Sequence, residues 1–191
     1  SLPPFDFFTQ KLTPMIQELY QKAIHFAGEK HSDQKVPGTN ANYLLHISNV
    51  AMEILVAYSY TKDFDIHYAI QMAILHDILE DTKTTYKEVR EHFGDNVAKG
   101  VLALTKDSAL DSKKEKMSDS LKRINQLQNE VGMVKLADRI TNLQEPPKHW
   151  DGAKKADYLE EAKLLAAFLN GKNEYLHNRL LSKIEDYRNY L

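Results

Sequence analysis

The chain has 191 residues, with 27 acidic and 25 basic side chains, a formal net charge of −2 and no cysteine. This length fits one domain with its own core, so we expect a single domain over residues 1–191, with residues 1–12 forming an N-terminal arm. The absence of cysteine excludes disulfides, thiolate metal sites and cysteine nucleophiles. Any demanding chemistry must come from His, Asp, Glu, Lys and Arg.

The near-neutral charge argues against a broad nucleic-acid-binding surface. No apolar run approaches the roughly 20 residues that span a bilayer, and the first residues lack the basic-then-apolar order of a signal peptide. We therefore expect a cytoplasmic protein with neither a nucleic-acid nor a membrane partner.

The first half of the chain has helical periodicity, because apolar residues recur at intervals of three and four. Thr85 and Glu88 have the spacing of a capping box, and Asp95 is placed to cap the helix that follows. Pro37 and Gly38 lie in a polar loop, residues 32–42. Helices are predicted at Pro14–His31, Asn42–Tyr60, Asp65–Asp81, Thr85–Phe93 and Asp95–Leu104.

The second half begins with a charge-rich stretch, Lys106–Met117, which we interpret as an exposed loop. Helical spacing then returns, interrupted by Pro146 and Pro147. There is no sustained period-two strand pattern, so the predicted fold class is all-α with about eight or nine helices. The apolar stripes of the last two helices are also compatible with a homodimer. These later helices are predicted at Ser118–Gln128, Glu130–Leu143, Ala153–Asn170 and Glu174–Tyr190.

Four ionisable residues lie within an apolar run at positions 76 to 81. On one helix, His76 would lie above Glu80 and Asp77 above Asp81, on neighbouring strips of one surface. Burying these groups without partners would be costly, and a divalent cation is a natural partner. Imidazole with carboxylate suits Mn, Fe, Zn or Mg-like ions, and the oxygen-rich set differs from a closed structural zinc site.

Two further candidates, His46 and Asp138, lie on other apolar helices. Alone, His46 is more often a hydrogen-bonded core residue, and Asp138 could pair with Lys135 or Arg139. Together with His76 and Asp77 they form a set of two histidines and two aspartates on three helices. Such a set predicts a mixed nitrogen and oxygen metal site with open positions for water and substrate.

These residues resemble a known family, the HD superfamily of metal-dependent phosphohydrolases. The segment HDILEDT, residues 76–82, is similar to the HD-x-x-E-D-T signature of Rel/Spo-type alarmone hydrolases. Residues 134–143, VKLADRITNL, resemble that group's KLADR-x-x-N-L segment, and residues 93–97 resemble its F-G-x-x-V element. The resemblance covers roughly residues 15–190 and implies an HD-domain helical bundle.

The resemblance also implies a function, the Mn-dependent hydrolysis of guanosine 3′,5′-bis(diphosphate) (ppGpp) to GDP and pyrophosphate. Mg, Fe or Zn would also fit the ligand types. Lys135 and Arg139 could instead be structural ion pairs, and Tyr43 could be a core aromatic rather than a residue that stacks on the base. The implied metal ligands are His46, His76, Asp77 and Asp138. The implied catalytic pair is Glu80 and Asp81, and the implied substrate-binding residues are Lys35, Tyr43, Lys135, Arg139 and Asn142.

One region departs from the family pattern. Relatives carry a basic cluster and then P-Y-I-x-H-P before the first ligand, whereas here Asn42 and Ile47 replace the prolines and Lys35 is the obvious cation. Two alternatives therefore stay open: a hydrolase of another nucleotide or phosphorylated metabolite, and a catalytically silent binding module. The intact Glu80 and Asp81 argue against the silent module. The six other histidines, His31 among them, are expected to be bystanders.

Overall fold

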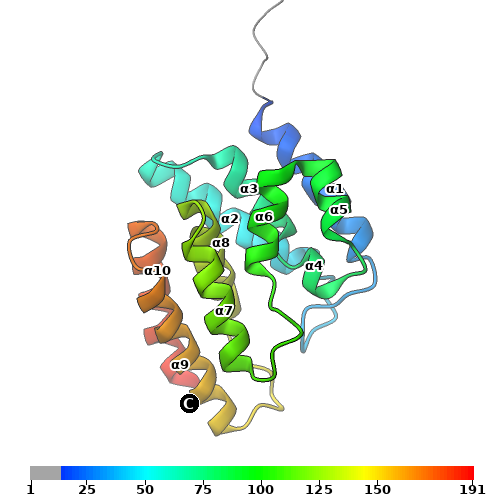
Figure 1. Cartoon of the computed structure of the whole chain (residues 1–191). Helices are drawn as coiled ribbons and strands as arrows, with labels where there is room; N and C mark the ends of the chain where they lie inside the picture. Colours follow the sequence, from blue (N-terminus) through cyan, green and yellow to red (C-terminus); the bar gives the residue numbers. More distant parts are fainter. Residues whose placement is uncertain (1–13) are drawn as a thin grey trace, which may run out of the picture.

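A computed structural model describes residues 14–191, and the predicted N-terminal arm, residues 1–12, lies outside the described residues. Within the described part the chain forms helices and no strand, which confirms the all-α prediction. Figure 1 shows their arrangement. The helices are α1 (Ile16–Lys30), α2 (Leu44–Thr61), α3 (Ile66–Leu75), α4 (Ile78–Asp81), α5 (Tyr86–Phe93), α6 (Asp95–Leu104), α7 (Lys113–Asn125), α8 (Asn129–Asn142), α9 (Gly152–Phe168), α10 (Glu174–Tyr187) and the 3₁₀-helix η1 (Arg188–Tyr190).

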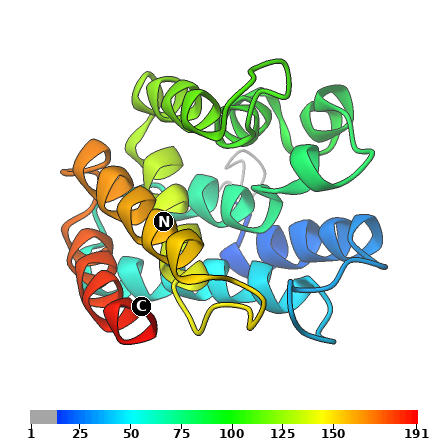
Figure 2. The same ribbon diagram turned by 90° about the horizontal axis from the view of Figure 1, so that it is seen from below.

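Helices α3 and α8 form the centre of the bundle. Seven of the ten residues of α3 are buried, and α3 packs against α1, α2, α6 and α8. Ten of the fourteen residues of α8 are buried, including the charged Asp138 and Arg139. Seen from below in Figure 2, both helices lie between the pair α1 and α2 on one side and α5 to α7 on the other. The charged side chains of Asp138 and Arg139 on α8 are therefore enclosed by the fold.

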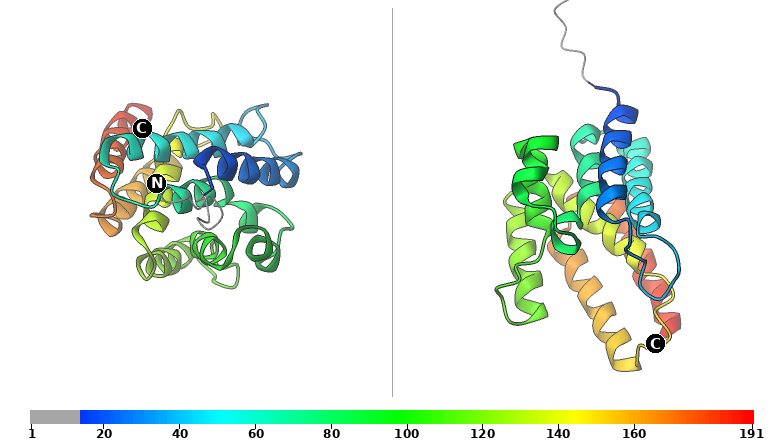
Figure 3. Two further views of the ribbon diagram at one scale, coloured as in Figure 1. Left: turned by 90° about the horizontal axis from the view of Figure 1, so that it is seen from above. Right: turned by 90° about the vertical axis from the view of Figure 1, so that its right-hand side faces the viewer.

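The C-terminal helices α9 and α10 pack on each other, and α10 also packs on α2 and α8. Figure 3 shows them extending below the rest of the bundle. Arg179 on α10 donates three hydrogen bonds to the carboxylate of Glu53 on α2, at 2.8 to 3.1 Å. Leu164, Phe168 and Leu181 remain exposed on this pair of helices, and the homodimer through them stays a prediction.

One predicted helix, Asp65–Asp81, is divided in the structure. Helix α3 ends at Leu75, and α4 begins at Ile78. Asp77 lies between them with φ −100° and ψ 1°, in the sparsely populated bridge region where active-site residues are often found. In place of the single predicted helix, the structure therefore has two, α3 and α4.

Other details of the helices also differ from the predictions, although α6 spans Asp95–Leu104 as predicted. Helix α1 begins at Ile16 rather than at Pro14, and Asp95 is the first residue of α6 and makes no capping bond. The stretch predicted as a loop over Lys106–Met117 becomes helical at Lys113. Ser112 and Glu115 form a capping box there, like that of Thr85 and Glu88. The many charged residues of this stretch favoured the prediction of a loop, although Ser112 and Glu115 have the spacing that begins a helix.

In the part of the chain that the structure describes, no helix combines the length and apolarity needed to cross a bilayer.

Candidate metal centre

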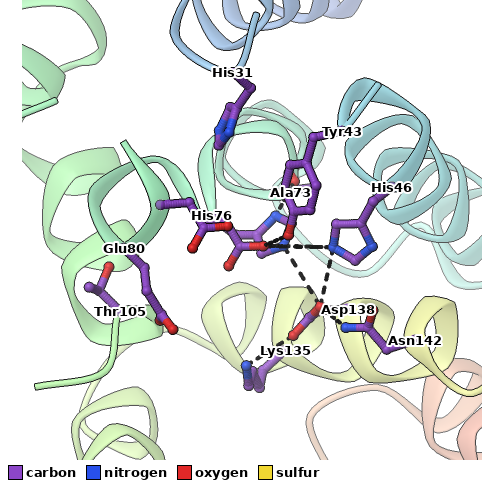
Figure 4. Close-up of polar contacts among 12 residues, drawn as sticks. His31, Tyr43, His46, Ala73, His76, Glu80, Thr105, Lys135, Asp138 and Asn142 are labelled. Carbon is purple, nitrogen blue, oxygen red and sulfur yellow. Dashed lines mark hydrogen bonds and ion pairs between the residues drawn. The ribbon is translucent and has the colours of Figure 1, made fainter. Parts of the chain in front are cut away.

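Four side chains converge at one end of the two central helices (Figure 4). His46 comes from the first turn of α2, His76 and Asp77 follow the last residue of α3, and Asp138 comes from α8. His46, His76 and Asp138 are buried, with 5%, 2% and 7% of their surfaces exposed. The four residues are far apart in the sequence, and they meet because α2, α3 and α8 pack against one another.

The distances describe one cluster of donor atoms. Nε2 of His46 lies 3.2 Å from Nε2 of His76, and Nε2 of His76 lies 2.9 Å from Oδ2 of Asp77. Oδ1 of Asp138 lies 3.4 Å from Nε2 of His46 and 3.7 Å from Nε2 of His76. One ligand atom each of His46, His76 and Asp77 lies within 4.8 Å of the others.

The orientation of His76 follows from its other nitrogen. Nδ1 of His76 lies 2.8 Å from the backbone oxygen of Ala73, which can only accept a hydrogen bond. Nδ1 therefore carries a proton, and Nε2 is the nitrogen directed at the cluster. Metal-ligating histidines are usually oriented in this way.

Both aspartates are held by hydrogen bonds. Tyr43 donates its hydroxyl proton to Oδ2 of Asp77 at 2.5 Å. Asn142 donates to Oδ1 of Asp138 at 2.7 Å, and Nζ of Lys135 lies 2.9 Å from Oδ2 of the same carboxylate. These contacts fix the direction in which each carboxylate presents its free lone pairs.

The electrostatic environment keeps both carboxylates ionised. Burial alone would raise the pKa of Asp77, but the His76 charge outweighs it and holds that pKa below its usual range. Burial likewise opposes ionisation of Asp138, yet the Lys135 ammonium holds the pKa of Asp138 well below its usual range. Burial would lower the pKa of His76, but Asp77 raises it to about 9. The cluster therefore favours positive charge at its centre.

Glu80 and Asp81, the predicted catalytic pair, point in different directions. Glu80 accepts hydrogen bonds from the backbone nitrogen and Nζ of Lys106, at 3.1 and 2.8 Å, where the chain leaves α6. Asp81 accepts a hydrogen bond from Gln34 at 2.8 Å. The sequence predicted that His76 lies above Glu80, and Asp77 above Asp81, on one continuous helix. That prediction was wrong, because the helix is interrupted between Leu75 and Ile78.

The predicted substrate-binding residues are distributed differently. Lys35 is exposed in the loop between α1 and α2, and Asn142 and Lys135 contact Asp138 as described. Arg139 is buried, and its guanidinium lies 4.4 Å from the ring centre of Tyr158 and 3.5 Å from Glu161. This is the structural pairing that we weighed as an alternative for Arg139.

Two residues near the cluster were missed by sequence reasoning. His31, expected to be a bystander, is 1% exposed, and its ring lies 5.2 Å from that of Tyr43. Its Nδ1 lies 2.6 Å from Oε1 of Gln34, and Nε2 of Gln34 donates a hydrogen bond to Oδ2 of Asp81. The only sign of this contact in the sequence is the three-residue spacing of His31 and Gln34. That spacing alone does not indicate a role, because the sequence does not show that Asp81 lies beside the pair.

The donor set fits a divalent cation. Two imidazole nitrogens facing each other at 3.2 Å cannot both accept or both donate, and the nearby carboxylate oxygens only accept. A shared positive charge satisfies all of them, and mixed imidazole and carboxylate ligands suit Mn, Fe, Zn or Mg-like ions. The residues present therefore can hold a divalent metal.

Comparison with known proteins identifies the family. The HD domain family matches residues 23–172. The chain is 31% identical over 164 residues to guanosine-3′,5′-bis(diphosphate) 3′-pyrophosphohydrolase MESH1 of Danio rerio, covering 83% of this chain and 88% of that protein. It is 38% identical over 133 residues to guanosine-3′,5′-bis(diphosphate) 3′-pyrophosphohydrolase of Aquifex aeolicus, covering 69% of this chain but 18% of that longer protein.

A solved structure gives the same result at the level of the fold. That structure, described as a metazoan ortholog of SpoT that hydrolyzes ppGpp and plays a role in starvation responses, superposes with a TM-score of 0.76 at 25% identity. The superposition covers 91% of this chain and 97% of that one. The segment that matches the HD domain family, residues 23–172, contains all four residues of the cluster, His46, His76, Asp77 and Asp138. The chain belongs to the HD domain family.

Proposed function

We propose that this chain hydrolyses ppGpp at its 3′-pyrophosphate, giving GDP and pyrophosphate, with one Mn ion held by His46, His76, Asp77 and Asp138. The observation that carries the proposal is the convergence of these four side chains from α2, from α8 and from the interruption between α3 and α4. The relatives named above for the same reaction support the choice of substrate.

The reaction is the addition of water across the bond between the ribose 3′ oxygen and phosphorus. The hydroxyl of the water joins the departing pyrophosphate, and a proton goes to the 3′ oxygen. A bound divalent cation acidifies water and offsets phosphoryl charge. Groups able to take up and deliver protons must therefore lie beside the cluster.

The chain's own residues divide this work. Tyr43 orients Asp77, while Lys135 and Asn142 orient Asp138, so the ligand set is rigid before substrate arrives. Glu80 and Asp81 are the groups that we assign to water activation and proton transfer. We assign Tyr43 to holding Asp77 rather than to stacking on the base, because Tyr43 is buried between the rings of His31 and His46.

The test is a product analysis. Purified protein is incubated with Mn and ppGpp, and GDP, pyrophosphate and orthophosphate are measured separately. We expect equal amounts of GDP and pyrophosphate, loss of activity with a chelator and recovery with Mn. Asp77→Ala should be inactive, whereas Asp107→Ala, in the exposed loop before α7, should match the wild type.

The alternatives predict other results. A hydrolase of a different nucleotide would turn over another member of a phosphorylated-nucleotide panel with a much higher kcat/KM than ppGpp. The sparse cations near Lys35 motivate that comparison. A binding module would retain metal and bind ppGpp without releasing product. Either result would overturn the proposal.

A further inference from the structure

The turn after α1 joins two polar side chains beside the metal centre. Helix α1 ends at Lys30, and the backbone nitrogen of Gln34 donates to the oxygen of His31 at 3.0 Å, which closes a turn. The backbone nitrogen of Tyr43 donates to the oxygen of Gln34 at 2.9 Å. Both ends of the turn are thus held by backbone contacts, and His31 and Gln34 face each other through their side chains at 2.6 Å.

The direction of each hydrogen bond in this chain can be assigned. An ionised carboxylate only accepts, so the amide nitrogen of Gln34 faces Asp81 and its oxygen faces His31. The proton between Gln34 and His31 must then belong to Nδ1 of His31. Nε2 of His31 is buried and has no hydrogen-bond partner among the described residues. One arrangement of protons therefore accounts for the whole chain from His31 to Asp81.

The surroundings restrict movement of the imidazole. His31 is 1% exposed, and its ring lies against Tyr43, whose ring centre lies 5.1 Å from that of His46 on α2. Gln34, which His31 holds in place, donates a hydrogen bond to Asp81 at the end of α4, 47 residues away in the chain. Desolvation raises the pKa of Asp81, and the Gln34 hydrogen bond opposes that rise. The contact therefore favours an ionised, oriented carboxylate.

We propose that His31 and Gln34 are positioning residues that hold the Asp81 carboxylate in its working orientation through the hydrogen-bonded relay His31–Gln34–Asp81. The relay rests on the hydrolytic function proposed above, because it acts through a carboxylate assigned to that reaction. Neither residue is assigned a contact with substrate. Their effect should therefore fall on turnover rather than on substrate affinity.

Steady-state kinetics with Mn and ppGpp test this role. Gln34→Ala and His31→Leu should lower kcat by about 10- to 100-fold, because the Asp81 carboxylate loses the groups that orient it for proton transfer, with little change in KM. His31→Asn should recover most of the activity, because its amide nitrogen can donate from near the position of Nδ1. His25→Gln, on the exposed face of α1, is the matched control and should equal the wild type.

A double-mutant cycle separates positioning from general damage. If Gln34 acts through Asp81, adding Gln34→Ala to Asp81→Asn should cause no further loss of kcat. Losses that multiply, an unrescued His31→Asn variant, or full activity of Gln34→Ala would each contradict the relay.

Histidine nitrogen NMR of the metal-free wild type tests the relay without turnover. We expect His31 to carry its proton on Nδ1, with Nε2 unprotonated. A neutral His31 protonated on Nε2 would contradict the relay even if ppGpp is hydrolysed. Conversely, the expected tautomer in a protein that releases no pyrophosphate would overturn the proposed substrate and leave the hydrogen-bonded relay standing.

Discussion

The hydroxyl of Tyr43 lies 2.5 Å from Oδ2 of Asp77, and the same oxygen lies 2.9 Å from Nε2 of His76. One carboxylate oxygen is thus fixed by a phenol on one side and an imidazole on the other. Because the loop before α2 supplies Tyr43 and the end of α3 supplies Asp77, this contact connects the two segments at the metal centre.

Tyr43→Phe removes the donor while keeping the ring. We expect Mn affinity to fall by about 10- to 100-fold, because Asp77 loses the group that orients it. Titration calorimetry of the metal-free protein measures this. Tyr58→Phe is the control, since the ring of Tyr58 packs edge-on against Phe64. Equal affinity of Tyr43→Phe and the wild type would show that Asp77 needs no such support.

Removal of Asp138 should have two separable effects. Asp138→Ala should lose bound metal, and it should also lower the free energy of unfolding by about 3–5 kcal/mol, because it leaves the largely buried Lys135 ammonium without its partner. Adding Lys135→Met should restore much of the stability but none of the metal binding. Metal analysis and chemical denaturation check these results. A normal metal content in Asp138→Ala would refute the ligand set.

The ion pair of Glu53 and Arg179 should stabilise the contact between α2 and α10. Glu53 is buried and its carboxylate accepts three bonds from one guanidinium. Arg179→Met should therefore destabilise the fold by about 3–5 kcal/mol, whereas the double variant with Glu53→Met should lose less. Arg188→Met, which breaks an exposed pair with Glu185, is the control for denaturant melts. Equal stability of Arg179→Met and the control Arg188→Met would contradict the argument.

Acid should weaken the capping box of α5. The bonds from Thr85 and the Lys30 charge lower the pKa of Glu88 to about 2 from an ordinary value of 4.5. Its contribution is fully present above pH 4.5 and is lost as the pH falls towards 2, because the unfolded chain binds the proton first. The melting temperatures of the wild type and Glu88→Gln should therefore converge between pH 5 and pH 2. A constant difference would exclude this effect.

Much of the fold follows from local sequence patterns. The spacing of apolar residues predicts the helices, and Thr85 with Glu88 predicts the start of α5, because these signals act over a single turn. Ser112 and Glu115 carry the same signal for α7, and the surrounding charges led us to expect a loop instead. The interruption at His76 and Asp77 could not be predicted from periodicity, because the apolar pattern continues through it.

The site was predictable only in part. The family resemblance names the residues that converge, but the roles of Tyr43 and Asn142 at the carboxylates depend on how α2, α3 and α8 pack. His31 shows the limit most clearly. Its partner Gln34 is nearby in sequence, whereas Asp81 reaches the pair only through the tertiary fold.

The most direct test of the central claim is a titration of Mn into metal-free protein with ppGpp present, with pyrophosphate release followed at each step. The account predicts that the rate rises in proportion to added Mn and levels off at one Mn per chain, with GDP and pyrophosphate formed in equal amounts. Full turnover without metal, a plateau at two Mn per chain, or no pyrophosphate at saturating Mn would contradict it.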